Sequence, residues 1–359
     1  MTDGQPTEYQ ALLAQAHAAY HALRLDEALQ LYQAALAERP DDYDACLGMA
    51  RTLTRRRDQE GARAYAERCL ALDPSRFEGH AALGALYFLT DQFDEAITAL
   101  TEAVERAPEE PEPHLTLTQV YADLRRFDEA NEELERGREA IRTIADDDER
   151  RQHEAFVYHV QTYLRLAEGK DAEARESAQE VIARQADNPH AASLAYSNLG
   201  ILDARARRYD TAIEYLERAL AMNPSFYRAG GALGRILLVR NRNERAAEVL
   251  EQVLETAPRE SGSTRYAYAM ALGRLKRRDE SREQFRRAIE EGLKGPDLLM
   301  ARWQLIWQSS LGRQVLIGLV LLAVLLWIVL GNPSPTALTF LALLVLILVL
   351  QRTVGKRQR

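Results

Sequence analysis

The apolar residues of the chain recur with a helical spacing inside a longer period. Matching sets are Ala28, Tyr32 and Ala35; Ala62, Ala66 and Cys69; and Ala96, Leu100 and Ala103. Steps of four and three residues place each set on one stripe of an α-helix. Helix-breaking prolines follow the sets at Pro40, Pro74 and Pro108, which lie 34 residues apart. The pattern predicts an all-α chain built from a repeated unit.

The same unit returns later in the chain and contains a second helix. Further stripes are Ala212, Leu216 and Ala219, and Ala246, Leu250 and Val253, followed by Pro224 and Pro258. Before each stripe, a helix carries small and aromatic residues, as in Leu83, Gly84 and Tyr87 or Tyr196, Leu199 and Gly200. Small residues there let two helices approach closely. In the turns "DQFDEA" and "RRYDTA", an acid follows the aromatic residue and favours the start of the next helix.

This arrangement resembles the tetratricopeptide repeat, a 34-residue helix-turn-helix unit with small, aromatic and proline residues at fixed offsets. The resemblance covers residues 8 to 293. It implies an α-solenoid, in which stacked helix pairs form a superhelix with a concave surface. It also implies a protein that binds other proteins.

The spacing divides the chain into about eight units. We expect an N-terminal tail (1–8), four units (9–144), an acidic connection (145–154) and four further units (155–295). The connection, which contains "ADDDERR", suggests a joint between two sub-arrays. The alternative is one continuous superhelix with a single long helix at this point.

In the family that the chain resembles, bound peptides contact set positions of the first helix in each unit. The residues at those positions that we select as a binding groove are Leu13, His17, Tyr20, Arg51, Arg55, Phe88, Gln119, His159, Tyr163, Arg205, Arg228, Arg235, Tyr266 and Arg274. Arginines beside aromatic residues favour an acidic or carboxylate-ended partner segment. The alternative is that these arginines are solvated or paired with glutamates of neighbouring repeats.

One specialised role of the family is disfavoured. The carboxylate clamp that grips heat-shock chaperone tails needs a Lys and an Asn, and the corresponding positions hold Leu13 and His17, then Leu47 and Arg51. Asn198 alone stands where one clamp Asn is expected.

Charge is distributed unevenly along the chain. The net charge is -8, but Asp297 is the last acidic residue, and residues 1–297 hold 40 basic and 54 acidic residues, a net charge of -14. So acidic a surface argues against nucleic-acid binding, which needs basic residues to replace phosphate counterions. Two cysteines exclude a disulfide framework, and the polar N-terminus has no export signal, so we expect the repeats in a reducing cytosol.

The C-terminal region carries no charged residue from Gln314 to Leu350. The prolines of the loop 332–335 divide it, and we predict transmembrane helices at 314–331 and 336–351. An interfacial amphipathic helix (296–313) precedes them and a basic tail (352–359) follows. The expected anchors at the membrane surfaces are Trp303, Trp307, Arg313, Trp327 and Arg352. A buried soluble hairpin is the alternative.

The flanking basic residues place both ends of this hairpin, and hence the repeats, on the cytosolic side. The Ala- and Arg-rich composition suggests a bacterial inner membrane. We therefore expect a membrane-anchored adaptor whose partners are proteins or peptide segments and membrane lipid. Two alternatives are an accessory subunit that acts through its hairpin on a membrane enzyme, channel or envelope-assembly complex, and self-association through the concave face.

Few residues suggest chemistry. His17 and His21 have the spacing of a metal-binding pair on a helix, but no further ligand stands nearby in the sequence, so we interpret them as groove residues. There is no nucleophile elbow, phosphate-binding loop motif or paired-carboxylate signature. We expect neither a catalytic residue, a metal nor a cofactor.

Overall fold

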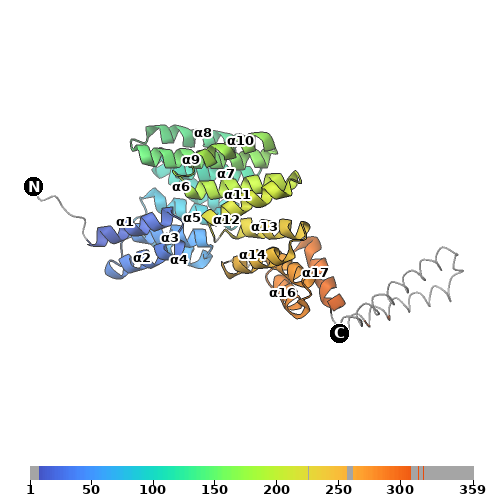
Figure 1. The fold of residues 1–359 in the computed structure, drawn as a ribbon. Helices are drawn as coiled ribbons and strands as arrows, with labels where there is room; N and C mark the ends of the chain where they lie inside the picture. The colour runs from blue at the N-terminus through green and yellow to red at the C-terminus, as the bar shows by residue number, and fades with distance from the viewer. Residues whose placement is uncertain (1–7, 225, 257–261, 309–313, 315–317, 319–359) are drawn as a thin grey trace, which may run out of the picture.

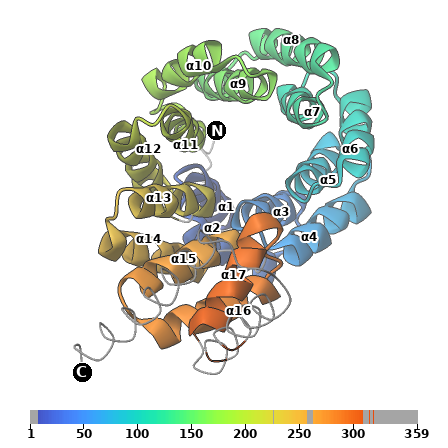
Figure 2. The same ribbon diagram turned by 90° about the vertical axis from the view of Figure 1, so that its right-hand side faces the viewer.

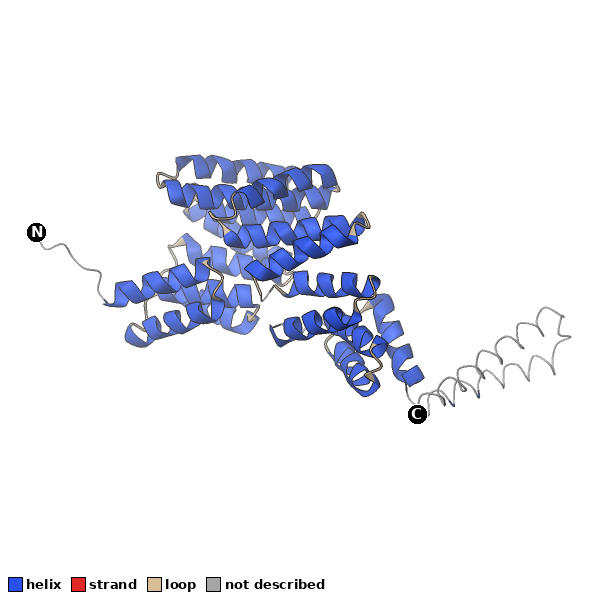
Figure 3. Cartoon of the chain, in the orientation of Figure 1, coloured by secondary structure: helices blue, strands red, loops and turns tan. Residues whose placement is uncertain are grey.

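A computed structural model describes residues 8–224, 226–256 and 262–308, together with Gln314 and Gly318. The described residues form seventeen α-helices and no strand (Figures 1 and 3). The helices are α1 (Glu8–His21), α2 (Leu25–Glu38), α3 (Tyr43–Arg56), α4 (Gln59–Leu72), α5 (Phe77–Leu89), α6 (Phe93–Arg106), α7 (Pro111–Asp123), α8 (Phe127–Thr143), α9 (Asp147–Glu168), α10 (Asp171–Ala183), α11 (Pro189–Arg205), α12 (Tyr209–Met222), α13 (Tyr227–Val239), α14 (Asn243–Thr256), α15 (Gly262–Arg274), α16 (Arg278–Glu290) and α17 (Gly295–Gln308). The prediction of an all-α array of helix pairs is confirmed.

All eight helix pairs use the same backbone turn between their two helices. One residue in each turn has a left-handed conformation, and these residues are Leu23, Arg57, Asp91, Arg125, Gly169, Arg207, Asn241 and Lys276. In the second pair, the N–H of Asp58 donates to the carbonyl of Leu53, which closes the end of α3 as a Schellman motif does. Only one of the eight residues is glycine, so the turn is maintained by packing of the helices rather than by glycine.

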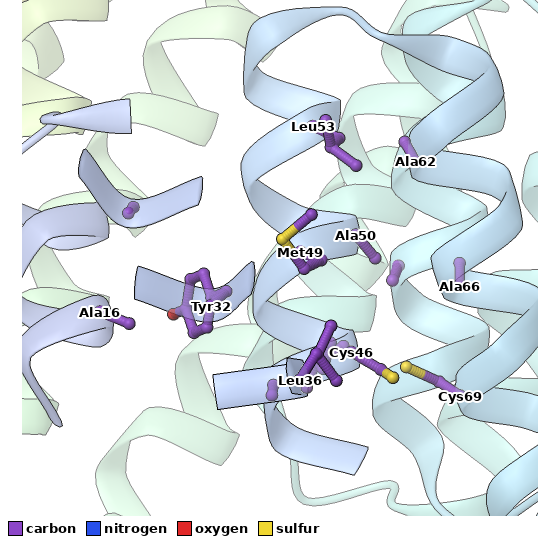
Figure 4. Packing of buried hydrophobic residues seen from close by; sticks show 14 of the residues in the cluster. Ala16, Tyr32, Leu36, Cys46, Met49, Ala50, Leu53, Ala62, Ala66 and Cys69 are labelled. Carbon is purple, nitrogen blue, oxygen red and sulfur yellow. The ribbon is translucent and has the colours of Figure 1, made fainter. Parts of the chain in front are cut away.

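Small residues bring the two helices of a pair into close contact. In three units, a glycine of the first helix faces a leucine of the second: Gly84 faces Leu100, Gly200 faces Leu216, and Gly234 faces Leu250. The stripes predicted from the sequence are buried in these interfaces. Figure 4 shows the same packing in the first two units, where the buried thiols of Cys46 and Cys69 point toward one another between α3 and α4.

Contacts between units explain the curvature of the array. Consecutive odd-numbered helices contact one another from α1 to α17, whereas no two even-numbered helices of the described chain share an extensive contact. The odd-numbered helices are therefore on the inner side of the bend. Figure 2 shows the resulting ring, with α7, α9, α11 and α13 inside and α8, α10 and α12 outside.

The ring brings distant parts of the sequence together. The guanidinium of Arg57, after α3, lies 4.9 Å from the ring centroid of Tyr227, at the start of α13. A cation–π contact of this kind contributes about 0.5–1 kcal/mol. The contact joins the second unit to the seventh.

The acidic stretch is not a connection, as residues 145–154 were predicted to be. Instead, α9 begins at Asp147 and runs for 22 residues. The Asp146 side chain accepts a hydrogen bond from the backbone N–H of Glu149, and three acids occupy the first turn, where the helix dipole favours negative charge. The long-helix alternative describes this region correctly.

The C-terminal helix α17 packs on the last repeat. Leu298, Ala301 and Leu305 contact the cluster around Phe285, while Leu299 and Trp303 on the outer side are 67% and 45% exposed. No helix among the described residues is long and apolar enough to span a bilayer. Apart from Gln314 and Gly318, the predicted transmembrane helices lie outside the described residues.

Candidate binding surface on the concave side

The inner wall of the ring places most of the predicted groove residues in three groups. The first group lies on α1, α3, α7, α9 and α11, and the second lies on α5, α7, α9 and α13. The third lies on α13, α15 and α17. Each group takes its members from helices that are far apart in the sequence, because the superhelix brings successive first helices onto one surface.

Two arginines of α3 form the centre of the first group. Arg51 donates through Nη2 to Oε2 of Glu112 on α7, 2.5 Å away. The guanidinium of Arg55 stacks on the ring of Tyr20 at 3.8 Å and donates to the Tyr20 carbonyl at 3.2 Å. Burial, and then the positive charge of Arg51, lower the pKa of Arg55. Among the described residues, Glu112 is thus the one carboxylate that forms an ion pair with either arginine, and it pairs with Arg51.

Histidines surround these arginines. Burial, followed by the charge of Arg55, lowers the pKa of His21 to about 4. Burial, followed by the charge of Arg55, also lowers the pKa of His190. The neighbouring His159 lowers it further. His159 is 4% exposed, and burial lowers its pKa to about 4. These imidazoles are therefore neutral at pH 7.

Two more histidines lie at the edge of the group. His17 of α1 packs against the ring of Tyr32, with centroids 5.6 Å apart, and burial lowers its pKa. Burial also lowers the pKa of His153 on α9, where the acids Glu112 and Glu149 act in the opposite direction. Among the described residues, no three His, Cys, Asp or Glu side chains converge to hold a metal ion.

The second group is aromatic and acidic. The rings of Phe88 and Tyr163 meet edge to face with centroids 6.3 Å apart, and the Tyr163 hydroxyl donates to Asp123 at 2.6 Å. Burial raises the pKa of the Asp123 carboxyl, an effect that the hydrogen bond from Tyr163 and the charge of Arg228 reduce. Arg228 of α13 thus lies near the end of α7, on the same concave surface.

The third group lies at the C-terminal end of the array. A pocket of about 300 Å³ is lined by residues that include Met270, Arg274, Phe285 and Trp307. Arg274 donates to the carbonyl of Leu238 at 2.5 Å. The pocket combines an apolar wall with a guanidinium.

The other residues of this end lie near the pocket helices. The rings of Tyr266 and Phe285 are 5.7 Å apart. Burial lowers the pKa of Arg235, and the charge of Asp297 on α17 partly opposes this. Trp303 and Trp307 stack with centroids 6.2 Å apart. Arg313, Trp327 and Arg352 lie outside the described residues.

Three predicted groove residues lie outside the three groups. Gln119 is only 9% exposed, and Leu13 is half-buried against the first core cluster. Arg205 is exposed at the end of α11. Leu13 and Gln119 therefore stabilise the array more than they extend a binding surface.

Several residues of the surface were not identified from the sequence. Glu112, Asp123, His153 and His190 lie at or near helix ends, away from the first-helix positions that the family resemblance supplies. The available sequence signal was that all seven histidines of the chain fall on the first helices of the units. In the structure, an arginine of α3 acts on four of them, His17, His21, His153 and His190.

Comparison with known proteins identifies the repeat. The sequence model of the tetratricopeptide repeat matches residues 19–86, 87–146 and 204–275, more than half of the chain. No curated protein matches the chain.

Two solved structures are similar in fold. The APC/C hetero-tetramer Cut9-Hcn1 superposes with a TM-score of 0.61 at 15% identity, covering 86% of this chain and 57% of that chain. Yeast Tom70 superposes with a TM-score of 0.56 at 14% identity, covering 86% of this chain and 66% of that chain. This chain spans less than two thirds of the length of either structure, and identities this low establish the fold alone.

The buried histidine of α9 makes stability depend on pH. Because the pKa of His159 is about 4 in the fold and 6.5 in a model peptide, the unfolded state binds the proton more tightly. The contribution of the neutral His159 to the stability of the fold is present above pH 6.5 and is lost as the pH falls toward 4. The unfolding free energy of the wild type falls between pH 7 and pH 4.5 in part because of this histidine. We expect the fall to be about 2 kcal/mol smaller in His159→Gln.

Urea unfolding of both proteins at the two pH values measures this difference, and Arg142→Gln, which changes an exposed residue of α8 and removes no histidine, is the control. Equal pH dependence in the wild type and His159→Gln would show that His159 is not buried as a neutral imidazole.

Proposed function

Because this chain belongs to the tetratricopeptide repeat family, we propose that it is a non-catalytic adaptor that binds protein partners on its concave surface. Stacked helix pairs of this kind present an extended inner surface suited to a partner segment. The observation that carries the proposal is the gathering of polar, aromatic and basic side chains from α1 through α13 on that surface. Their number and spread suit a segment several residues long.

The partner segment is acidic or carboxylate-ended. Arg51 is paired, as the alternative interpretation from the sequence expected, but Glu112 belongs to a unit two repeats away. Among the described residues, no carboxylate lies within ion-pair distance of Arg55, Arg228 or Arg235. Guanidinium groups without a carboxylate partner bind carboxylates strongly because both N–H groups of the fork can donate.

The adaptor is held on the cytosolic face of a bacterial inner membrane by its C-terminal segment. Two sequence features support this: the uncharged stretch from Gln314 to Leu350, and the basic residues on both of its sides. The exposed apolar side of α17, which carries Leu299, Met300 and Trp303, is adjacent to that segment and suits a bilayer surface. Attachment to one surface raises the effective concentration of two partners without any new contact.

Charge reversal on the concave side tests the adaptor. We expect the fourfold variant Arg51→Glu, Arg55→Glu, Arg228→Glu and Arg235→Glu to lose at least tenfold of its partner capture, because it repels an acidic segment. The measurement is crosslinking in membranes followed by mass spectrometry.

A matched control carries the same charge change on the outer helices, with Arg142→Glu, Arg218→Glu, Arg245→Glu and Arg286→Glu. Circular dichroism verifies that both variants keep their helices. If the two variants capture the wild-type partners equally well, the concave side does not bind them through charge.

Vesicle flotation tests the anchor. We expect the full-length chain to float with liposomes and to resist carbonate extraction, whereas a chain that ends at Gln308 stays in solution, because the apolar segment supplies the insertion energy. A full-length chain that remains in solution would refute the membrane proposal and leave the adaptor proposal intact.

A further inference from the structure

Three nitrogen atoms around the two arginines of α3 are buried without a hydrogen-bond partner. They are Nε of Arg51, Nδ1 of His159 and Nδ1 of His190, on α3, α9 and α11. A buried donor or acceptor without a partner costs about 1–3 kcal/mol, and native proteins leave few of them. Such atoms on α3 and on the two adjoining helices α9 and α11 therefore indicate a place that a hydrogen-bonding ligand completes.

These atoms belong to one cluster. The charge of Arg55 and the ring of His159 both act on His190, and the charges of Arg55 and Arg51 act on His21. The helices α1, α3, α9 and α11 thus contribute to a single site, although the sequence separates His21 from His190 by most of the array. We call Arg51, Arg55, His21, His159 and His190 the axial cluster.

The charge of the axial cluster identifies the ligand chemistry. Arg51 and Arg55 carry two positive charges, and Glu112 is the one carboxylate within ion-pair distance of either among the described residues. Arg55 otherwise contacts the Tyr20 carbonyl and ring, which leaves part of its guanidinium fork unused. An anion is the ligand that balances the second charge and accepts hydrogen bonds from both guanidinium groups.

We propose that the axial cluster binds a carboxylate or phosphate group of the partner segment and takes up protons on its histidines when it does so. The inference rests on the proposed binding function of the concave surface and assigns the anchoring point of the ligand. Nε of Arg51 and the free fork of Arg55 donate to the anion. The Nδ1 atoms of His159 and His190 donate to it once the imidazoles are protonated.

The sign of the pH dependence follows from the environment of the histidines. Burial alone lowers the pKa of His159, and burial followed by the charge of Arg55 lowers the pKa values of His21 and His190, so these imidazoles are neutral at pH 7. A bound anion favours the imidazolium form, so binding raises the affinity of the histidines for protons. By linkage, the anion binds more tightly as the pH falls.

Other titratable and charged groups face the cluster from the surrounding helices. They are His17 and Tyr20 on α1, Tyr32 on α2, Asp42 and Asp44 at the start of α3, Glu78 on α5, Glu110 and Glu112 at the start of α7, and Glu149 and His153 on α9. Protonation of Glu112 would also release Arg51 and strengthen anion binding. The test therefore has to separate the histidines from the acids.

Calorimetry of the full-length chain in detergent micelles provides that test, with hexaglutamate and inorganic phosphate as probes. Titrations at pH 6.0 and pH 7.5, each in two buffers of different ionisation enthalpy, report the affinity and the number of protons taken up. We expect at least fivefold tighter binding at pH 6.0, with net proton uptake. The probe that binds more tightly tells whether the site prefers a carboxylate or a phosphate group.

Variants assign the effect to the axial cluster. We expect Arg55→Gln to weaken binding at least tenfold, and the double variant His159→Gln and His190→Gln to reduce proton uptake and the difference between the two pH values. Arg142→Gln, which removes an exposed charge from the outer helix α8, serves as the control and should bind as the wild type does. Equal binding by Arg55→Gln, undiminished proton uptake by the histidine variant, or no binding of either probe at millimolar concentration would overturn the proposal.

The failure of this inference differs from a failure of the adaptor. If Arg55→Gln captures partners in membranes as the wild type does while the fourfold charge reversal does not, the concave surface binds partners without the axial cluster. If the fourfold variant also captures them normally, the proposed binding surface itself is wrong.

Discussion

The architecture depends on the close approach of the two helices within each unit. At Gly84, Gly200 and Gly234, an added Cβ would lie 2.4–2.6 Å from a side-chain carbon of the leucine on the second helix. Side-chain atoms do not tolerate such distances, so these positions have room for a hydrogen atom only. Each tight pair then stacks on the next, and the first helices of successive units contact one another whereas the second helices of the described units share no extensive contact. The curvature of the array follows from this difference.

Curvature in turn creates the binding surface. A straight stack would leave α3, α9 and α11 far apart, whereas the ring places both Arg55 and His159 within electrostatic reach of His190. The surrounding protein keeps water away from these groups, so their charges interact more strongly than on an open surface. This explains how a basic, histidine-rich centre exists in an array whose net charge is strongly negative, and why burial dominates the pKa values there.

The sequence predicts the elements because each unit repeats its own pattern, and Ala96, Leu100 and Ala103 are buried on the stripe that their spacing indicates. It does not predict the left-handed turn, since residues as different as Leu23 and Arg57 adopt it under the constraint of packing. Nor does it predict that Arg57 meets Tyr227, or that His190 joins Arg55. These contacts depend on the pitch accumulated over several units, and no single repeat encodes that pitch. The interpretation of the acidic stretch as a connection was wrong because consecutive acids suit the first turn of a helix as well as a loop.

The central claim is that close helix approach at the first-helix glycines supports the array and its concave surface. It is tested most directly by the unfolding free energy of Gly84→Val, measured in urea against Ala18→Val, which places the same valine side chain at an exposed position of α1. The account predicts a loss of about 2 kcal/mol or more for Gly84→Val and little change for the control. Equal stability of the two variants would contradict it, because the helices of the third unit would then have room that the structure does not give them.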